Sequence, residues 1–185
     1  MFLVAETELL LAVRDFLRTY LGDIPNNDIQ IEIDDTPPAT AGHLYVAIIP
    51  HGTVPGDKNN SMDLTHHYQV GCRIVVFERI TDIPRDRRRC VVEPVNNWLT
   101  DIAVAIRFNY TIINTANAAL ADRGRTGKFT RPLIPQGADS KPQLVTGEDY
   151  NSRKKSQQGD PWVAVKRGIN FGMAEFFSQE ERTED

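Results

Sequence analysis

The feature that most constrains the fold is a run of alternating apolar and polar residues over positions 64–80. Successive side chains of a β-strand point to opposite faces of a sheet, so this period predicts one long strand. Such a strand extends past the usual length of about five or six residues. Its odd positions, Arg73 among them, are mostly polar, and we expect them to face solvent. Its even positions are apolar and predict the buried face: Tyr68, Val70, Cys72, Ile74 and Val76.

Other segments repeat their apolar residues every three or four positions, which is the period of one helix face. Residues 5–21 predict a helix that ends at Gly22. Residues 91–106 predict a second helix, which should either begin at Pro94 or kink there. Residues 114–121 predict a further short helix. The helical residues expected to cover the buried face of the long strand are Leu9, Val13, Phe16 and Trp98.

Three more segments predict strands. Residues 29–34 alternate strictly, which would place Ile29, Ile31 and Ile33 on one face. Residues 43–49 are more fully apolar, and the turn-forming residues of 50–63 predict the tip of a long hairpin. Residues 162–176 alternate again and predict the last strand.

This order of elements predicts an α+β fold: a central mixed or antiparallel sheet of about four strands, with helices packed on one face. We expect a single domain over residues 1–185, with its core in residues 5–122 and 162–177. Residues 123–161 are polar, rich in Gly and Pro and without a clear period, and predict a long extended arm. Residues 178–185 form an acidic tail.

Composition argues against several classes of protein. With 21 basic and 25 acidic residues the net charge is -4, which argues against general nucleic-acid binding. No apolar run approaches the roughly 20 residues that cross a bilayer. The N-terminal residues lack the basic start of a secretory signal and are interrupted by Glu6 and Glu8. Cys72 and Cys90 are too few for a disulfide scaffold, which favours a reducing compartment.

No motif predicts catalysis. His66 and His67 are adjacent on the expected long strand, so they point to opposite faces and are poorly placed to share a metal ion. Cys90 follows three arginines, which would lower the pKa of its thiol, but no base or resolving partner is visible. Residues 124–128 are similar to a phosphate-binding loop, but their spacing is wrong and Phe129 stands where a hydroxyl residue is required. We therefore expect no catalytic residue, no cofactor and no metal.

Two charged clusters are the candidate subunit-interface residues. The basic cluster lies at an expected helix start, where cations oppose the helix dipole, so we expect an acidic partner surface. The acidic tail of a neighbouring copy would provide it, and a solvated run of charge is the alternative explanation. The basic residues are Arg85, Arg87, Arg88 and Arg89, and the acidic residues are Glu180, Glu181, Glu184 and Asp185.

In this order the segments resemble the tail terminator proteins of tailed bacteriophages, which form a ring at the top of the tail tube, and the related cap proteins of contractile injection systems. About two-thirds of the chain carries the resemblance, which is one of element order and not of a diagnostic motif. The resembling segments are the helix at 8–21, the strand at 68–77, the basic turn at 83–87, the helix through Trp98 and Ile102, and the strand at 168–175.

The resemblance implies a non-enzymatic virion protein, assembled in the host cytoplasm, whose copies form a ring that is most often sixfold. The implied partners are the chain itself, the tail-tube protein and the head-side connector or neck protein. DNA would pass through the lumen without specific binding, and no membrane is implied. Two alternatives stay open. One is another neck component, such as a head-closure or tail-completion protein, and the other is a small soluble enzyme or metal-binding protein.

Overall fold

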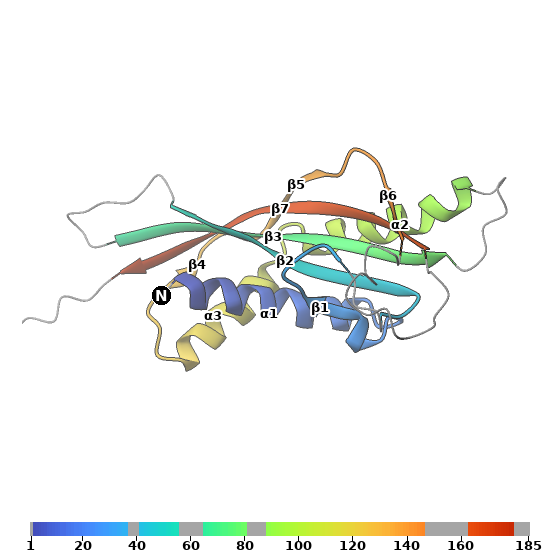
Figure 1. The fold of residues 1–185 in the computed structure, drawn as a ribbon. Coiled ribbons are helices and arrows are strands. Elements are labelled where there is room, and N and C mark those ends of the chain that lie inside the picture. Colours follow the sequence, from blue (N-terminus) through green and yellow to red (C-terminus); the bar gives the residue numbers. More distant parts are fainter. Residues whose placement is uncertain (1, 37–40, 56–64, 81–87, 147–162, 180–185) are drawn as a thin grey trace, which may run out of the picture.

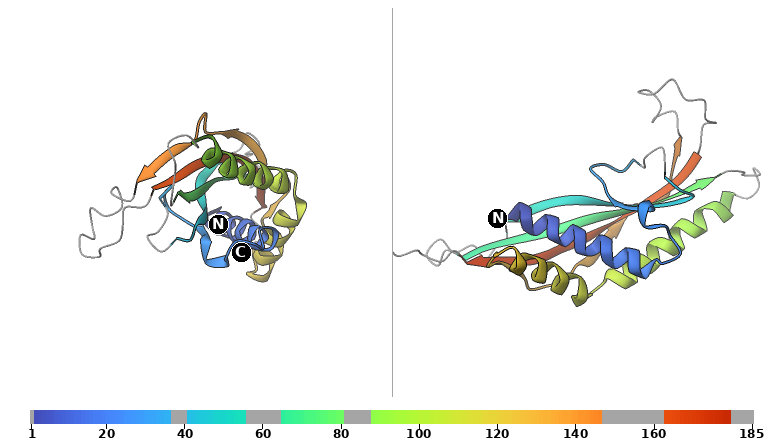
Figure 2. Two further views of the ribbon diagram at one scale, coloured as in Figure 1. Left: turned by 90° about the vertical axis from the view of Figure 1, so that its right-hand side faces the viewer. Right: turned by 90° about the horizontal axis from the view of Figure 1, so that it is seen from below.

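The computed structural model describes residues 2–36, 41–55, 65–80, 88–146 and 163–179. The chain builds two layers, a long twisted sheet and a layer of helices on one face of it (Figures 1 and 2). The α+β class and the placement of the helices on one face are confirmed. We call the covered side of the sheet the helix face and the other side the outer face.

The described residues form three α-helices and one short 3-10 helix. The second α-helix begins before Pro94, so the expected start at that proline is wrong. The third is longer than expected, because the Asn109 side chain caps its first turn by accepting a hydrogen bond from the backbone N–H of Thr111. The helices are α1 (Phe2–Tyr20), η1 (Asn26–Asp28), α2 (Arg88–Ile106) and α3 (Tyr110–Asp122).

The strands form one mixed sheet in the order β1-β2-β3-β7-β4, with β5 and β6 also paired to β7. Only β1 and β2 run parallel among the described pairs, and the rest are antiparallel. The strands are β1 (Ile29–Ile31), β2 (Leu44–Pro55), β3 (Thr65–Ile80), β4 (Lys128–Phe129), β5 (Ile134–Ala138), β6 (Gln143–Thr146) and β7 (Val163–Gln179).

The sheet has seven strands, and not about four as expected. The additional strands come from the segment expected to be an extended arm. Since β3 occupies one side of β7 along its whole length, β4, β5 and β6 pair in succession along the other side. Residues 128–146 therefore form one interrupted edge row, which corrects the prediction of an arm for that part. The remainder of the predicted arm, residues 147–161, lies outside the described residues.

The two longest strands form the spine of the sheet. β3 and β7 pair from Thr65 opposite Gln179 to Ile80 opposite Val163, with one irregularity between Val70 and Cys72. The long strand predicted from alternation is thus confirmed, and its partner is the predicted last strand. In Figure 1 these strands run nearly the full length of the molecule.

The main core lies between the helix face and the helices. As expected, the even positions of β3 from Val70 to Val76 are buried there, and Tyr68 is partly buried against the same cluster. The helices contribute the predicted Leu9 and Val13, with Phe16 and Trp98 partly buried beside them. The described core residues of α2 and α3 include Val95, Leu99, Ile102, Ile106, Ile112, Ile113, Ala116 and Leu120.

The outer face carries a second, smaller buried cluster. Val75 and Phe77 of β3 pack there with Tyr45 of β2, so the expected exposure of the odd positions is wrong at these two residues, and it is also wrong at the buried His67. The segment after β1 lies over this face: the Tyr45 hydroxyl donates a hydrogen bond to Glu32, and the Lys166 ammonium lies 2.8 Å from the Asp35 carboxylate.

The same segment departs from the prediction for the first strand. β1 ends at Ile31, and not at position 34 as the alternation indicated. Ile29 is buried and Ile31 is partly buried, but Ile33 is 95% exposed. The expected shared face of the three isoleucines is therefore wrong at Ile33.

A polar cluster joins β7 to the turn between β5 and β6. The Arg73 guanidinium lies 2.8 Å from the Asp139 carboxylate and donates a further hydrogen bond to Asn170. The backbone N–H of Gly168 donates to the Asp139 carboxylate. In return, the backbone N–H of Asp139 donates to the Gly168 carbonyl. Arg73 is therefore a partly buried, paired residue and not the solvent-facing one that the alternation predicted.

Candidate interaction surface

The predicted interface residues fall mostly outside the described part of the chain. Arg88 and Arg89 are the first two residues of α2, so the expected basic helix start is present in the backbone. Their side chains are not among those described, and neither are Arg85, Arg87 or the acidic residues Glu180, Glu181, Glu184 and Asp185. The described structure thus brings none of the predicted interface side chains together.

The described residues place a different candidate surface at the corner between α2 and α3. Four exposed apolar side chains gather there from α2, the turn after it, α3 and β5. Val104 is 69% exposed, Phe108 56% and Tyr110 57%, and Ile134 is also exposed. We call this set the apolar corner. Large apolar side chains that cluster in the open mark interaction sites more often than isolated ones do.

Phe108 is held at this corner in a strained backbone conformation. Its φ of 55° lies in the left-handed region, where a bulky non-glycine residue is an outlier. Its backbone N–H donates to the Leu133 carbonyl at 3.2 Å. The next residue, Asn109, donates from its side chain to the Ala105 carbonyl at 3.0 Å and accepts from Thr111 N–H at 2.9 Å. These bonds fix the turn on both sides, so the strain is imposed by the way α2 and α3 are joined.

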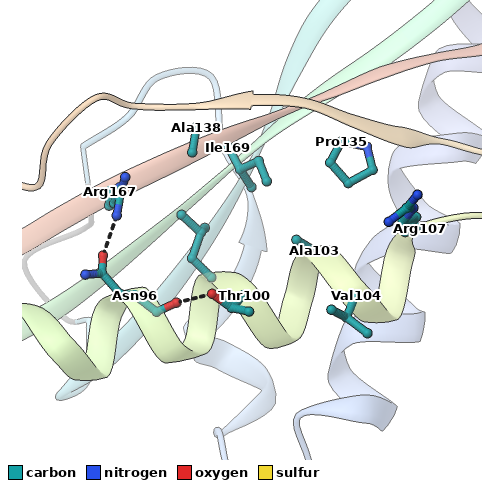
Figure 3. A pocket seen from close by; sticks show the side chains of 10 residues that line it. Asn96, Thr100, Ala103, Val104, Arg107, Pro135, Ala138, Arg167 and Ile169 are labelled. Carbon is teal, nitrogen blue, oxygen red and sulfur yellow. Dashed lines mark hydrogen bonds between the residues drawn. The ribbon is translucent and has the colours of Figure 1, made fainter.

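Two grooves adjoin the apolar corner. The first, of about 370 Å³, lies between α2 and the strands β5 and β7, and Figure 3 shows its side chains. It is lined mainly by Leu99, Ala103, Val104, Arg107, Pro135 and Ile169. The second, of about 420 Å³, lies under the two exposed rings, and we call it the aromatic groove. It is lined by Gln69, Phe108, Tyr110, Arg131, Pro132, Ile134 and Gln136.

The charged side chains of these grooves are basic. The Arg107 guanidinium lies over the Phe108 ring, 5.0 Å from its centre, and it also lines the first groove. Arg131 lines the aromatic groove. Arg167 lies at one end of the first groove, where it donates to Asn96 at 2.7 Å (Figure 3), and it also donates to the Asp139 carbonyl. The described residues that line the two grooves include no carboxylate, imidazole or thiol. This arrangement suits the binding of an apolar group with negative charge beside it.

Other residues considered in the sequence lie away from this surface. Cys72 is fully buried, and burial raises the pKa of its thiol to about 12, so it is poorly suited to act as a nucleophile. His67 is buried on β3 beside His66, whose side chain is not described, and the side chain of Cys90 is not described either. Within the described ranges no three His, Cys, Asp or Glu residues gather closely enough to hold a metal ion.

One carboxylate outside the grooves has a perturbed pKa. Burial raises the pKa of Glu78 above its ordinary value, and the imidazole of His43 opposes this rise from 3.5 Å away. The pair lies at the end of β3 beside the start of β2, because Glu78 is opposite Leu44 in the sheet.

Comparisons with family models and with curated proteins add no relative. No family model matches the sequence, and a search of curated proteins found no match. Among the described helices, none has the length and apolar character needed to span a membrane.

Sequence reasoning missed the apolar corner, although a signal for it was present. Asn109 stands between two aromatic residues, Phe108 and Tyr110, at the junction of two helical patterns. Asparagine is a preferred first-turn cap, so it marks a helix start at residue 110. That start would leave both neighbouring rings at the turn between two helices, where they have no place in the core.

Proposed function

We propose that this chain is a structural virion protein that forms a ring at the head-proximal end of a phage tail. The ring ends growth of the tail tube and joins the tail to the neck. The proposal assigns no catalytic residue, cofactor or metal to the chain. Its partners are further copies of itself, the tail-tube protein and the head-side connector, and DNA passes through the lumen without specific binding.

The observation that carries the proposal is the order of the described elements. A leading amphipathic helix, α1, is followed by the long strand β3, a helix α2 that begins with basic residues, and a late long strand, β7, that completes the sheet. This is the order for which the sequence resembles tail terminator proteins. The apolar corner adds support, because an assembling subunit needs surface that only a partner covers.

The test is assembly, measured in solution and on tails. The expected species is a closed ring, identified by mass photometry or sedimentation over a concentration series and by its symmetry in electron micrographs. In solution with the tail-tube protein of the same virus, the chain should bind tube ends and stop their elongation. A chain that stays monomeric at high concentration and is also absent from assembled tails would overturn the proposal.

The same assay separates the nearest alternative. A head-closure or tail-completion protein would bind purified portal complexes and leave the elongation of tail tubes unchanged. Binding to portal complexes without any effect on tubes would therefore replace a terminator role with that of another neck component.

A further inference from the structure

The segment after β1 presents one bare aliphatic side chain between carboxylates. Ile33 is 95% exposed, more than any other large apolar side chain described. Glu32 precedes it, and Asp34 and Asp35 follow it. We call residues 32–35 the acidic tip. A single exposed isoleucine is ordinary by itself, so the argument depends on how the tip is held and on what would fit it.

The acidic tip is fixed on both sides of Ile33. Glu32 accepts a hydrogen bond from the Tyr45 hydroxyl, and Asp35 pairs with Lys166 at 2.8 Å. Asp34 accepts the backbone N–H of Thr36 at 3.0 Å, which closes a local turn. A segment that is already ordered loses little conformational entropy when it binds, so the exposed Ile33 is a preorganised contact.

The aromatic groove has the complementary chemistry. Its walls include the rings of Phe108 and Tyr110 and the side chain of Ile134, which suit a branched aliphatic group. Arg131 lines the same groove, and Arg107 lies over the Phe108 ring. An apolar group flanked by carboxylates therefore finds apolar walls and a basic rim.

The two surfaces lie far apart on the same molecule. The acidic tip contacts outer-face side chains, because Tyr45 and the neighbouring Phe77 lie in the outer-face cluster and Lys166 is opposite Phe77 in the sheet. The aromatic groove is instead lined by Gln69, eight residues before Phe77 along β3, and at a rise of about 3.3 Å per residue this separates the two surfaces by about 26 Å. One copy cannot bring its own tip to its own groove, so the match can be used only between copies.

We infer that the acidic tip of one copy binds the aromatic groove of the next, with Ile33 seated between Phe108 and Tyr110. Two unlike patches that meet in this way make a heterologous contact, which closes into a ring when the rotation between copies permits it. The inference rests on the proposed function, since it supplies the contact by which that ring would form.

Two variants remove one patch each and leave the other intact. The tip variant is Ile33→Asp, which replaces the apolar side chain with a charge. The groove variant combines Arg107→Glu with Phe108→Gly, which removes one wall and reverses the rim charge. Ala121→Asp is the matched control, because it places the same added charge at the exposed far end of α3. Circular dichroism and thermal unfolding establish that all variants are folded.

Each variant alone should assemble with a dissociation constant at least about 30-fold higher than that of the parent, the effect of losing a hot-spot residue. The control should assemble like the parent. Mixing the two variants should give a heterodimer that grows no further, since the mixture retains only one working pair of patches. Mass photometry distinguishes these species. If the parent assembles only on tail tubes, incorporation into tails is scored in place of the ring.

The outcomes separate this inference from the proposed function. If the parent forms a ring and both variants form it equally well, the contact lies elsewhere and the proposed function stands. If both variants fail but their mixture gives no heterodimer, the two patches do not meet each other. If only the groove variant fails, the groove binds a segment of the neighbouring copy other than the acidic tip, and the inference is overturned. A parent found neither in rings nor in tails overturns both proposals.

Discussion

The Arg73 guanidinium on β3 lies directly over the α-carbon of Gly168 on β7, so that a β-carbon at position 168 would come within 2.5 Å of Nη2. The same guanidinium pairs with Asp139, whose carboxylate accepts the backbone N–H of Gly168. The absence of a side chain at 168 therefore makes room for an ion pair that fastens the edge row to the sheet.

Gly168→Ala should destabilise the protein, although glycine is usually the weaker residue in a strand. The added methyl group displaces Arg73 from Asp139, and we expect the free energy of unfolding to fall by about 1–3 kcal/mol. In an Arg73→Ala background the same change should cost much less, because there is no guanidinium to displace. Urea denaturation of the parent, the two single variants and the double variant gives the coupling free energy between residues 73 and 168. Equal costs in both backgrounds would show that the two residues do not interact.

Ile74→Ala should lower the free energy of unfolding by about 2–5 kcal/mol, because it leaves a cavity in the core of the helix face. Val54→Ala is the control on the neighbouring strand, where the side chain is exposed, and it should change the stability by less than about 0.5 kcal/mol. Denaturant titration measures both. Similar small effects from the two substitutions would contradict the observed register of β3.

Phe108→Gly should give a more stable protein than Phe108→Ala, by about 1 kcal/mol. Both variants lose the aromatic ring and its contact with Arg107, but only glycine adopts a φ of 55° without steric cost. Thermal and chemical unfolding of the two variants, compared with each other, measure the backbone strain minus the greater unfolded-state entropy of glycine. An alanine variant clearly more stable than the glycine variant would contradict a strained turn at this residue.

The Glu78 carboxyl should make stability depend on pH. Because its pKa is raised in the folded protein, the folded state holds this proton more tightly than the unfolded state does. Stability from this group is therefore present below the ordinary glutamate pKa and is lost as the pH rises through the raised value. Glu78→Gln should remove that loss, so the free energy of unfolding of the variant, relative to that of the parent, should increase with rising pH. Unfolding titrations at a series of pH values measure it.

His43 provides the internal control for this effect. Its imidazole lowers the pKa of Glu78 in opposition to burial, so His43→Gln should raise that pKa further. The decline of stability with rising pH starts near the ordinary glutamate pKa in both proteins, and in the variant it should continue to a higher pH than in the parent. A carbon-detected NMR titration of the Glu78 carboxyl would follow the pKa directly, and a fall of that pKa in the His43 variant would contradict the assignment.

The arginines at the start of α2 remain a predicted interface. Arg87→Glu combined with Arg88→Glu should leave the chain folded and weaken assembly. Assembly of the parent should itself weaken with added salt, since exposed pairs are screened over roughly 10 Å. Sedimentation at low and high salt tests both statements. If the double variant assembles and caps tails like the parent at low salt, these arginines are ordinary surface charge.

The long strands and the main core could be predicted from the sequence because their signals are local. The alternation around Ile74 reflects a strand whose two faces differ, and the helical period around Val13 reflects burial on one side. The edge row could not be predicted in this way. Strands such as β5 and β6 have β7 as their described partner, and their pairing depends on residues that come much later in the sequence.

The candidate surfaces were hidden for related reasons. Ile33 continues the alternation of β1, but Glu32 turns toward Tyr45 and the strand ends at Ile31. Phe108 comes only two residues after Ile106, the last core residue of α2, and its exposure goes with a left-handed turn whose backbone N–H donates to the Leu133 carbonyl. In both cases contacts with residues distant in the sequence decide where the side chain lies.

The position of β7 also governs how the protein is made. The strand lies between β3 and the edge row, so the sheet cannot close until residues 163–179 have left the ribosome. Before then, β3 and the segments of the edge row lack their common neighbour, and unpaired strand edges of this kind promote aggregation. The fold is therefore completed only after synthesis of nearly the whole described chain, and nascent chains halted before β7 would expose these unpaired strand edges.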